Sequence, residues 1–161
     1  MNVKLLGALA ALSLLAACAN PPAPTTTGAA TGSGATASNA GVTPGTEEDL
    51  VANVGDRVFF PYNESQLSGD ATGTLDRQAQ WLQQYPQVNV QVAGNCDDRG
   101  TEEYNLALGQ RRANAARDYL VARGVSSARV TTISYGKDRP VAQGDDEQAW
   151  SQNRNAITAV R

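Results

Sequence analysis

The stretch that decides the fold runs from residue 88 to residue 124 and reads VNVQVAGNCDDRGTEEYNLALGQRRANAARDYLVARG. Val88, Val90 and Val92 alternate with polar residues, which is the period of a strand with one buried face. After a loop, Thr101 can cap a long helix whose first turn is acidic, and Gly124 is well placed to end it. The stretch therefore predicts a strand, a loop and a long helix.

The predicted helix has one apolar face with many small residues. At alternating spacings of three and four, this face contains Leu106, Gly109, Ala113, Ala116 and Leu120. Small side chains let a helix axis approach its neighbour closely, so we expect the helix to lie close against a sheet.

Weaker patterns on both sides complete the order of elements. Short β-rich runs at 57–60, 130–134 and 156–160 predict further strands, the first of them ended by Pro61. Residues 68–85 predict a second long helix that begins at a Ser68 cap, and residues 145–153 a short one. The order is βαβαβ followed by a short helix and a closing strand. It predicts an α/β sandwich with helices packed on one face of a mixed sheet, and strands joined through a long helix should be parallel.

The N-terminus has the pattern of a lipoprotein signal. Lys4 precedes an apolar run from residue 5 to residue 17, which is too short for the roughly 20 residues needed to cross a bilayer. The sequence Leu15-Ala16-Ala17-Cys18 resembles the bacterial lipobox, in which the cysteine becomes lipidated after cleavage. The alternative is an ordinary secretory signal with an incidental Cys18. Position, flanks and spacing favour lipidation.

Residues 19–46 have the composition of a flexible linker. They are Pro, Ala, Thr, Gly and Ser with few exceptions and carry no charge, so they cannot bury enough surface to order themselves. Such a chain has a typical end-to-end distance of about 30 Å and a fully extended length of about 100 Å. Charged, patterned sequence starts at Glu47. We therefore predict a signal peptide at 1–17, a lipidated N-terminus and linker at 18–46, and a folded domain at 47–161.

Composition excludes several classes of function. At 161 residues with a net charge of −3, the chain holds one compact domain and has no broad basic field, so nucleic acid is not expected as a partner. It contains no histidine, and we find no metal-ligand spacing and no nucleophile paired with a base. We expect no enzyme activity, no metal and no cofactor. Cys96 is left without a partner once Cys18 is lipidated, and we expect it to be a small buried hydrophobe rather than a reactive thiol.

Charge is concentrated in the loop at 94–101 and one face of the helix that follows. Asp97 can accept hydrogen bonds from an ammonium group, and Arg112 can hold a carboxylate with its planar fork. A ligand with both groups on one carbon would be held at two points. The alternative is a solvated cluster of ion pairs among Asp97, Asp98, Arg99 and Arg112, which would contribute only about 0–1 kcal/mol per pair. Charge pattern alone favours the cluster.

The chain resembles the peptidoglycan-associated lipoproteins, a family with an OmpA-like domain. The resemblance spans about residues 55–161 and rests on the motifs at 94–101, 103–109, 111–115, 132–137 and 149–154. It implies non-covalent binding of peptidoglycan through the diaminopimelate of the stem peptide. The ligand residues implied are Asp97 for the ammonium, Arg112 for the carboxylate, Arg154 as a second carboxylate partner, Asn105 and Leu106 lining the pocket, and Arg99 and Phe60 at its rim.

The resemblance also implies a place in the cell. The protein would be anchored to the outer membrane by the lipid on Cys18, with its domain facing the periplasm, and would act in the Tol-Pal system at cell division with TolB and other Tol proteins as partners. Two alternatives stay open. One is a different OmpA-like wall anchor, such as an adhesin, motor or secretion accessory lipoprotein, and the other is an envelope enzyme that acts on peptidoglycan.

Four positions depart from the family pattern. Pro61 and Asn63 stand where the family usually has aspartates after the first strand, so carboxylate contacts are not expected there. Asn95 stands where histidine is common, and Asn155 where a second arginine is common. We expect binding with an altered rim.

Overall fold

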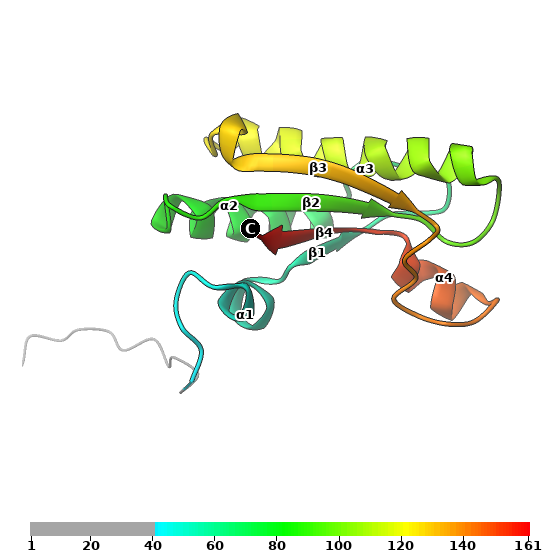
Figure 1. The fold of residues 1–161 in the computed structure, drawn as a ribbon, viewed down its shortest axis with the longest axis horizontal. Coiled ribbons are helices and arrows are strands. Elements are labelled where there is room, and N and C mark those ends of the chain that lie inside the picture. Colours follow the sequence, from blue (N-terminus) through cyan, green and yellow to red (C-terminus); the bar gives the residue numbers. More distant parts are fainter. Residues whose placement is uncertain (1–40) are drawn as a thin grey trace, which may run out of the picture. The chain divides into compact units, whose positions relative to one another are not determined.

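A computed structural model describes residues 41–161, so the predictions for the signal peptide, Cys18 and most of the linker lie outside the described residues. The described chain folds as a four-stranded sheet with two long helices on one face (Figure 1). The strands are β1 (Arg57–Phe59), β2 (Val90–Asn95), β3 (Val130–Gly136) and β4 (Asn155–Val160). The helices that cover the sheet are α2 (Gly69–Gln84) and α3 (Glu102–Ala122). The predicted α/β sandwich is confirmed.

The strand order is β1-β4-β2-β3, which the sequence did not predict. β2 and β3 pair in parallel across α3, and β4 is antiparallel to both β1 and β2. β1 and β2 therefore point in the same direction, as predicted for strands joined through a long helix, although β4 lies between them. The sheet is mixed for this reason.

The signals at the helix ends work as expected. The hydroxyl of Ser68 accepts a hydrogen bond from the Ala71 N–H at 3.2 Å, and Thr101 caps α3 in the same way. Gly124 has a φ of 94°, the left-handed conformation in which glycine commonly ends a helix. The bounds of five elements differ from prediction. β1 ends at Phe59, β2 runs from Val90 to Asn95, β3 extends to Gly136, α4 (Glu147–Asn153) is capped by Asp146, and β4 begins at Asn155.

The buried face of α3 begins one residue earlier than its apolar pattern indicates. Leu106 is 37% exposed, so the predicted inward position is wrong. The residues that point inward are Asn105, Leu108, Gly109, Arg112, Ala113, Ala116 and Leu120. An apolar pattern misses this register because two of the inward residues, Asn105 and Arg112, are polar.

Two glycines bring α3 into backbone contact with β2. A methyl group built on Gly94 would lie 1.8 Å from the carbonyl oxygen of Gly109, which leaves no room for any side chain. The predicted close approach is confirmed. It fixes the start of α3 directly over the end of β2.

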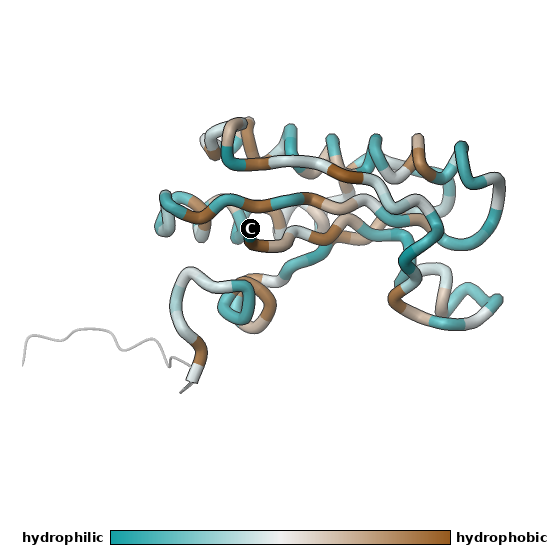
Figure 2. Tube along the Cα trace, viewed as in Figure 1, coloured by the Kyte–Doolittle hydropathy of each residue, from teal (hydrophilic) through white to brown (hydrophobic). Residues whose placement is uncertain are grey.

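The core lies between the sheet and the two long helices, and hydrophobic positions recur along the strands (Figure 2). Two short elements ahead of β1 were not predicted, namely α1 (Glu47–Asp49) and a π-helical turn, η1 (Leu50–Val54). The indole N–H of Trp81 on α2 donates to Asp49 at 2.8 Å and ties α1 to the core. A short 3-10 turn, η2 (Ser127–Arg129), precedes β3. Within residues 41–161, the helices all lack the combination of length and apolar character that a membrane crossing requires.

Candidate functional site

One cavity lies where β2 ends, α3 begins and the segment after β1 passes. Its volume is about 50 Å³. The residues that line it are Tyr62, Asn63, Cys96, Asp97, Arg99, Gly100, Tyr104, Asn105, Leu108, Arg112 and Arg154. The structure thus brings together residues from four separate parts of the chain, including Asp97 and Arg112.

The carboxylate of Asp97 is 4% exposed and faces two arginines. Its Oδ2 accepts a hydrogen bond from Arg99 Nη2 at 2.5 Å and a longer one from Arg154 Nη1 at 3.4 Å. The hydrogen bond to Asp97 raises the pKa of the Arg99 guanidinium. The ion pairs of Asp97 within the described chain are with these two arginines and not with Arg112.

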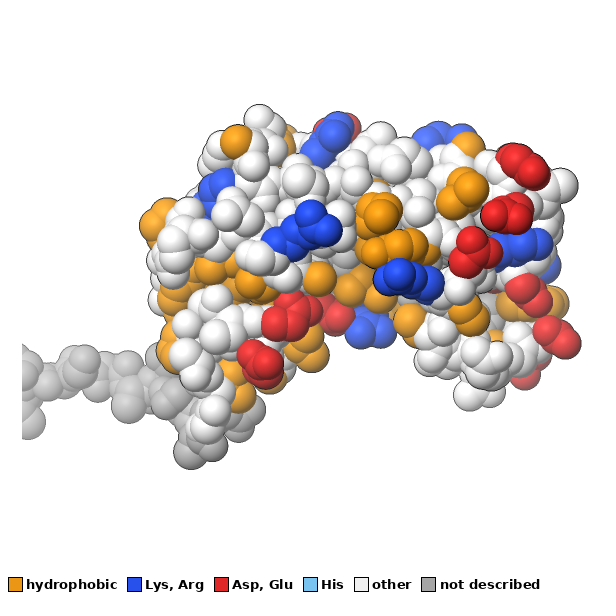
Figure 3. Space-filling model, viewed as in Figure 1, with side chains coloured by type: hydrophobic (Ala, Val, Ile, Leu, Met, Phe, Trp, Pro, Cys, Tyr) orange, Lys and Arg blue, Asp and Glu red, His pale blue; other side chains and the backbone are white. Residues whose placement is uncertain are grey.

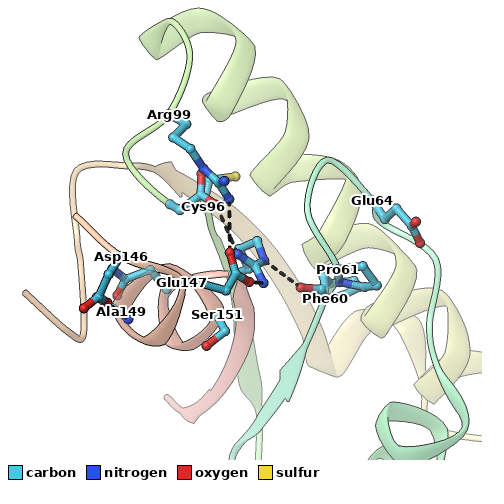
Figure 4. A network of polar contacts seen from close by, with 12 residues as sticks. Phe60, Pro61, Glu64, Cys96, Arg99, Asp146, Glu147, Ala149 and Ser151 are labelled. Carbon is cyan, nitrogen blue, oxygen red and sulfur yellow. Dashed lines mark hydrogen bonds and ion pairs between the residues drawn. The ribbon is translucent and has the colours of Figure 1, made fainter. Parts of the chain in front are cut away.

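Arg154 links the end of β1 to α4. Its Nε donates to the Phe60 carbonyl at 3.1 Å, and its Nη2 donates to Glu147 Oε1 at 2.5 Å. Figure 4 shows this network, with Phe60 at the end of β1 on one side and Glu147 of α4 on the other. Arg154 is 6% exposed, so it is held as part of the fold while it touches Asp97.

Arg112 is fully buried and fixes the backbone around the cavity. Its Nε donates to the Glu64 carbonyl and its Nη1 to the Asn95 carbonyl, both at 2.8 Å. Nη2 donates to the Pro61 carbonyl at 3.1 Å, and Nη1 also contacts the Cys96 sulfur at 3.5 Å. Four of the five guanidinium N–H groups therefore already have acceptors. Burial lowers the pKa of Arg112.

Two aromatic rings that the sequence interpretation did not assign enclose Arg99. Its Cζ lies 4.0 Å from the centroid of the Tyr62 ring and 4.1 Å from that of the Trp150 ring. Tyr62 follows β1 and Trp150 lies on α4. Trp150 belongs to the motif at 149–154, which was the available signal for it; Tyr62 had no signal because it sits in a loop of no regular pattern.

The other residues predicted for the site are placed as follows. Asn105 lines the cavity and donates from Nδ2 to the Arg99 carbonyl at 2.9 Å. Phe60 is 3% exposed and belongs to the core, where its ring lies 5.2 Å from the Arg112 Cζ. Only its backbone takes part in the network: its carbonyl accepts from Arg154 Nε, and its N–H donates to the Arg154 carbonyl at 2.9 Å. Leu106 is exposed and is not among the residues that line the cavity, whereas Leu108 lines it.

The positions that depart from the family pattern make their own contacts. Asn95 Nδ2 donates to Asn155 Oδ1 at 2.8 Å, so two of the departures pair with each other inside the domain. Asn63 has a φ of 58°, in the left-handed region, and accepts a hydrogen bond from the Tyr104 hydroxyl at the cavity rim. Cys96 is a buried free cysteine, as expected, and burial raises the pKa of its thiol.

Exposed acidic side chains gather at the end of the domain that contains the cavity, around the start of α3 and of α4. Those exposed at this end of the domain are Asp98, Glu102, Glu103, Asp145, Asp146 and Glu147. Figure 3 shows carboxylates gathered there. A cationic group would be attracted to this end of the molecule and an anionic one repelled. The arrangement suits a small ligand that presents an ammonium group first.

Comparisons with known proteins place this geometry in context. The OmpA family model matches residues 59–154. A relative named peptidoglycan-associated lipoprotein, from Mesorhizobium japonicum, is 52% identical over 153 residues, which cover 95% of this chain and 89% of the relative.

Two solved structures have the same fold. The crystal structure of the peptidoglycan-associated lipoprotein from Burkholderia pseudomallei is 42% identical, with a TM-score of 0.64 over 66% of this chain and 90% of that chain. The C-terminal domain of Helicobacter pylori MotB reaches a TM-score of 0.62 over 66% of this chain and 84% of that one. At 23% identity, this second likeness concerns the fold alone.

Proposed function

The chain belongs to the OmpA family and, within it, to the peptidoglycan-associated lipoproteins, and on that premise we propose that it binds peptidoglycan non-covalently. The ligand group is the diaminopimelate of the stem peptide, which carries an ammonium and a carboxylate on one carbon. The relatives are named as lipoproteins associated with peptidoglycan, and we propose a binding role without catalysis.

One observation carries the proposal: a buried carboxylate, Asp97, and a buried guanidinium, Arg112, line the same cavity. The carboxylate of Asp97 accepts the ligand ammonium. Arg112 supplies positive charge to the ligand carboxylate through the one N–H group that lacks a protein acceptor, and Arg154 is the second partner for that carboxylate. Asn105 supports the loop, and Arg99 stands at the rim.

The remainder of the proposal concerns anchoring. The lipid on Cys18 holds the chain in the outer membrane, and residues 18–46 tether the domain of residues 47–161 at a distance that allows it to reach the wall from the periplasmic side. Each buried lipid methylene contributes about 0.8 kcal/mol, so several acyl chains together hold a domain of this size. The protein thereby links the outer membrane to the cell wall.

We further propose that this link works within the Tol-Pal system, with TolB and other Tol proteins as partners, and supports invagination of the outer membrane at division. The basis is the family to which the chain belongs. Deletion of the gene should then weaken the outer membrane and delay constriction. A normal envelope with a lost appendage would instead favour another OmpA-like wall anchor.

The binding proposal is tested by sedimentation with purified sacculi. Asp97→Asn keeps the volume of the side chain almost constant but removes the negative charge that meets the ammonium. We expect the affinity for sacculi to fall by about 30-fold or more. Asp118→Asn is the matched control, because Asp118 is an exposed aspartate on α3 that lies outside the cavity lining. Thermal unfolding of both variants confirms that they fold. If Asp97→Asn sediments as well as the wild type, the assigned site is wrong, and any soluble fragments released from the sacculi would instead indicate an enzyme.

A further inference from the structure

Arg99 already occupies the place in front of Asp97. Its guanidinium contacts the carboxylate at 2.5 Å and lies between two aromatic rings, one after β1 and one on α4. Its remaining acidic neighbour, Glu147, is 4.0 Å away. In Figure 4, Arg99 reaches down from the loop between β2 and α3 toward α4. A cation of the protein itself is thus already paired with the carboxylate proposed for the ligand ammonium.

The space left beside Arg99 is too small for the ligand. A cavity of about 50 Å³ holds a few water molecules. Pockets for small molecules typically measure about 300–1,000 Å³. Movement of the Arg99 side chain would enlarge the cavity and free its carboxylate partner, Asp97.

Of the three arginines that line the cavity, Arg99 is the one suited to move. Arg112 and Arg154 have side chains that are 0% and 7% exposed and use all three of their guanidinium nitrogens as donors. The side chain of Arg99 is 29% exposed, and its buried Nε has no hydrogen-bond acceptor. Arg99 therefore has a route to solvent, and its closed position leaves one donor unsatisfied.

The backbone that carries Arg99 is fixed independently of the side chain. Asn105 Nδ2 donates to the Arg99 carbonyl at 2.9 Å, and Lys137 Nζ donates to the next carbonyl, that of Gly100, at 2.9 Å. The side chain can swing out while the loop stays in place. Opening the cavity then needs only rotamer changes, which are fast in exposed side chains.

We infer that Arg99 is a displaceable internal cation that competes with the ligand ammonium for Asp97, and that Tyr62 and Trp150 position it for this competition. The inference rests on the proposed function and deepens it. Binding exchanges one cation for another on the same carboxylate. Molecules in which Arg99 is paired with Asp97 cannot bind the ligand ammonium there, so they lower the measured affinity in proportion to their fraction. A ligand group that cannot displace the Arg99 guanidinium from Asp97 is rejected.

The test is whether removal of the Arg99 charge strengthens or weakens ligand binding. In Arg99→Met, the apolar stem remains between the rings and the competing charge is gone, so the full-length chain should bind a stem tripeptide containing diaminopimelate about tenfold more tightly in calorimetry. Tyr62→Leu removes one ring that holds Arg99 and should tighten binding by a smaller factor. A purely structural role of Tyr62 would instead weaken binding. Arg111→Met is the matched control, because it removes an exposed arginine outside the cavity lining and should leave affinity unchanged.

A second measurement follows Arg99 directly. The side-chain Nε–H signal of Arg99 in the wild type, assigned by its loss in Arg99→Met, should move to the position of an exposed arginine when the tripeptide is added. Weaker binding by Arg99→Met, or an Nε–H signal that does not respond, would overturn the inference while leaving the binding proposal intact. If neither the wild type nor Arg99→Met binds the tripeptide or sacculi, the proposed function itself fails.

Discussion

The two ends of the sheet are buried to a similar degree but are built from different chemistry. At the apolar end, where β2 starts and α3 finishes, the buried residues include Leu82, Val88, Val90, Leu120, Val125 and Val130. At the polar end, where β2 finishes and α3 starts, they include Asn95, Asp97, Asn105, Arg112, Asn153, Arg154 and Asn155. One end is held by packing, and the other by hydrogen bonds and charge.

The difference teaches where a binding site can be placed in a small domain. The polar end contains loop carbonyls, such as those of Pro61 and Glu64, that no strand or helix pairs, and Arg112 satisfies them. Buried polar groups are costly when unpaired, so this end depends on every partner being present. The apolar end provides the stability that allows Asp97 to be held in a cavity with few partners.

The largest effect is expected from Arg112→Met. The apolar stem is kept, but the carbonyls of Pro61, Glu64 and Asn95 lose their hydrogen bonds from Arg112, which should lower the free energy of unfolding by about 3–5 kcal/mol. Urea unfolding measures this loss, and sacculus binding should disappear with it. Arg111→Met, one residue away and exposed, should change stability by less than about 0.5 kcal/mol. A small loss of stability in Arg112→Met would mean that the polar end does not depend on the hydrogen bonds of Arg112.

Leu120→Ala tests the apolar end in the same assay. Leu120 is fully buried, and its truncation should lower the free energy of unfolding by about 3 kcal/mol through lost burial and the cavity left behind. The folded fraction should still bind sacculi with wild-type affinity, because no contact at the cavity changes. A loss of affinity per folded molecule would show that the two ends are coupled through α3.

Asp49 is a charged exception at the apolar end and should make that end sensitive to acid. Burial opposes its charge, but hydrogen bonds from Trp81, Asn53 and Gly45 outweigh burial and lower the pKa of Asp49 from its ordinary 3.8. Its stabilising contribution is therefore complete above about pH 4 and is lost as the pH falls through the lowered folded pKa. Asp49→Asn should cost about 1–2 kcal/mol at pH 7 and flatten the pH dependence below pH 4 in unfolding experiments. An unchanged slope in acid would contradict the assignment.

The smallest effect is expected for the pair Asn95 and Asn155. Because their side chains are hydrogen-bonded at 2.8 Å in the interior, the two alanine substitutions should not be additive. A double-mutant cycle should give a coupling of about 0.5–1.5 kcal/mol. Additivity within about 0.3 kcal/mol would mean that the two departures from the family pattern are independent of each other.

The sequence predicted those parts of the fold that depend on local pattern. The caps at Ser68 and Thr101, the glycine at 124 and the alternation of Val88, Val90 and Val92 each act within a few residues, and the structure confirms them. The position of β4 between β1 and β2 was not predictable in this way, because strand order depends on contacts between distant segments.

The candidate site was predictable as a set of residue types but not as a set of contacts. The charged residues can be identified from the sequence alone. The structure places Asp97, Arg99, Arg112 and Arg154 in the lining of one cavity. Leu106 was misplaced because an apolar pattern cannot register a helix whose buried face includes Asn105 and Arg112. The two rings on either side of Arg99 come from other elements, and no local pattern reveals them.

The chain enters the domain at the end of the sheet opposite the cavity. Glu47 Oε2 accepts the N–H of Val160 at 2.5 Å, whereas the other end of β4 begins at Asn155 beside the cavity (Figure 1). If the domain is tethered through residues 18–46 and holds its ligand at Asp97, as we propose, a pull between the two runs along the strands. Because the hydrogen bonds between antiparallel strands lie across the strand direction, tension loads those of β4 in shear and together, rather than opening them one after another. The domain is oriented to resist stretching along the same line on which it would be pulled.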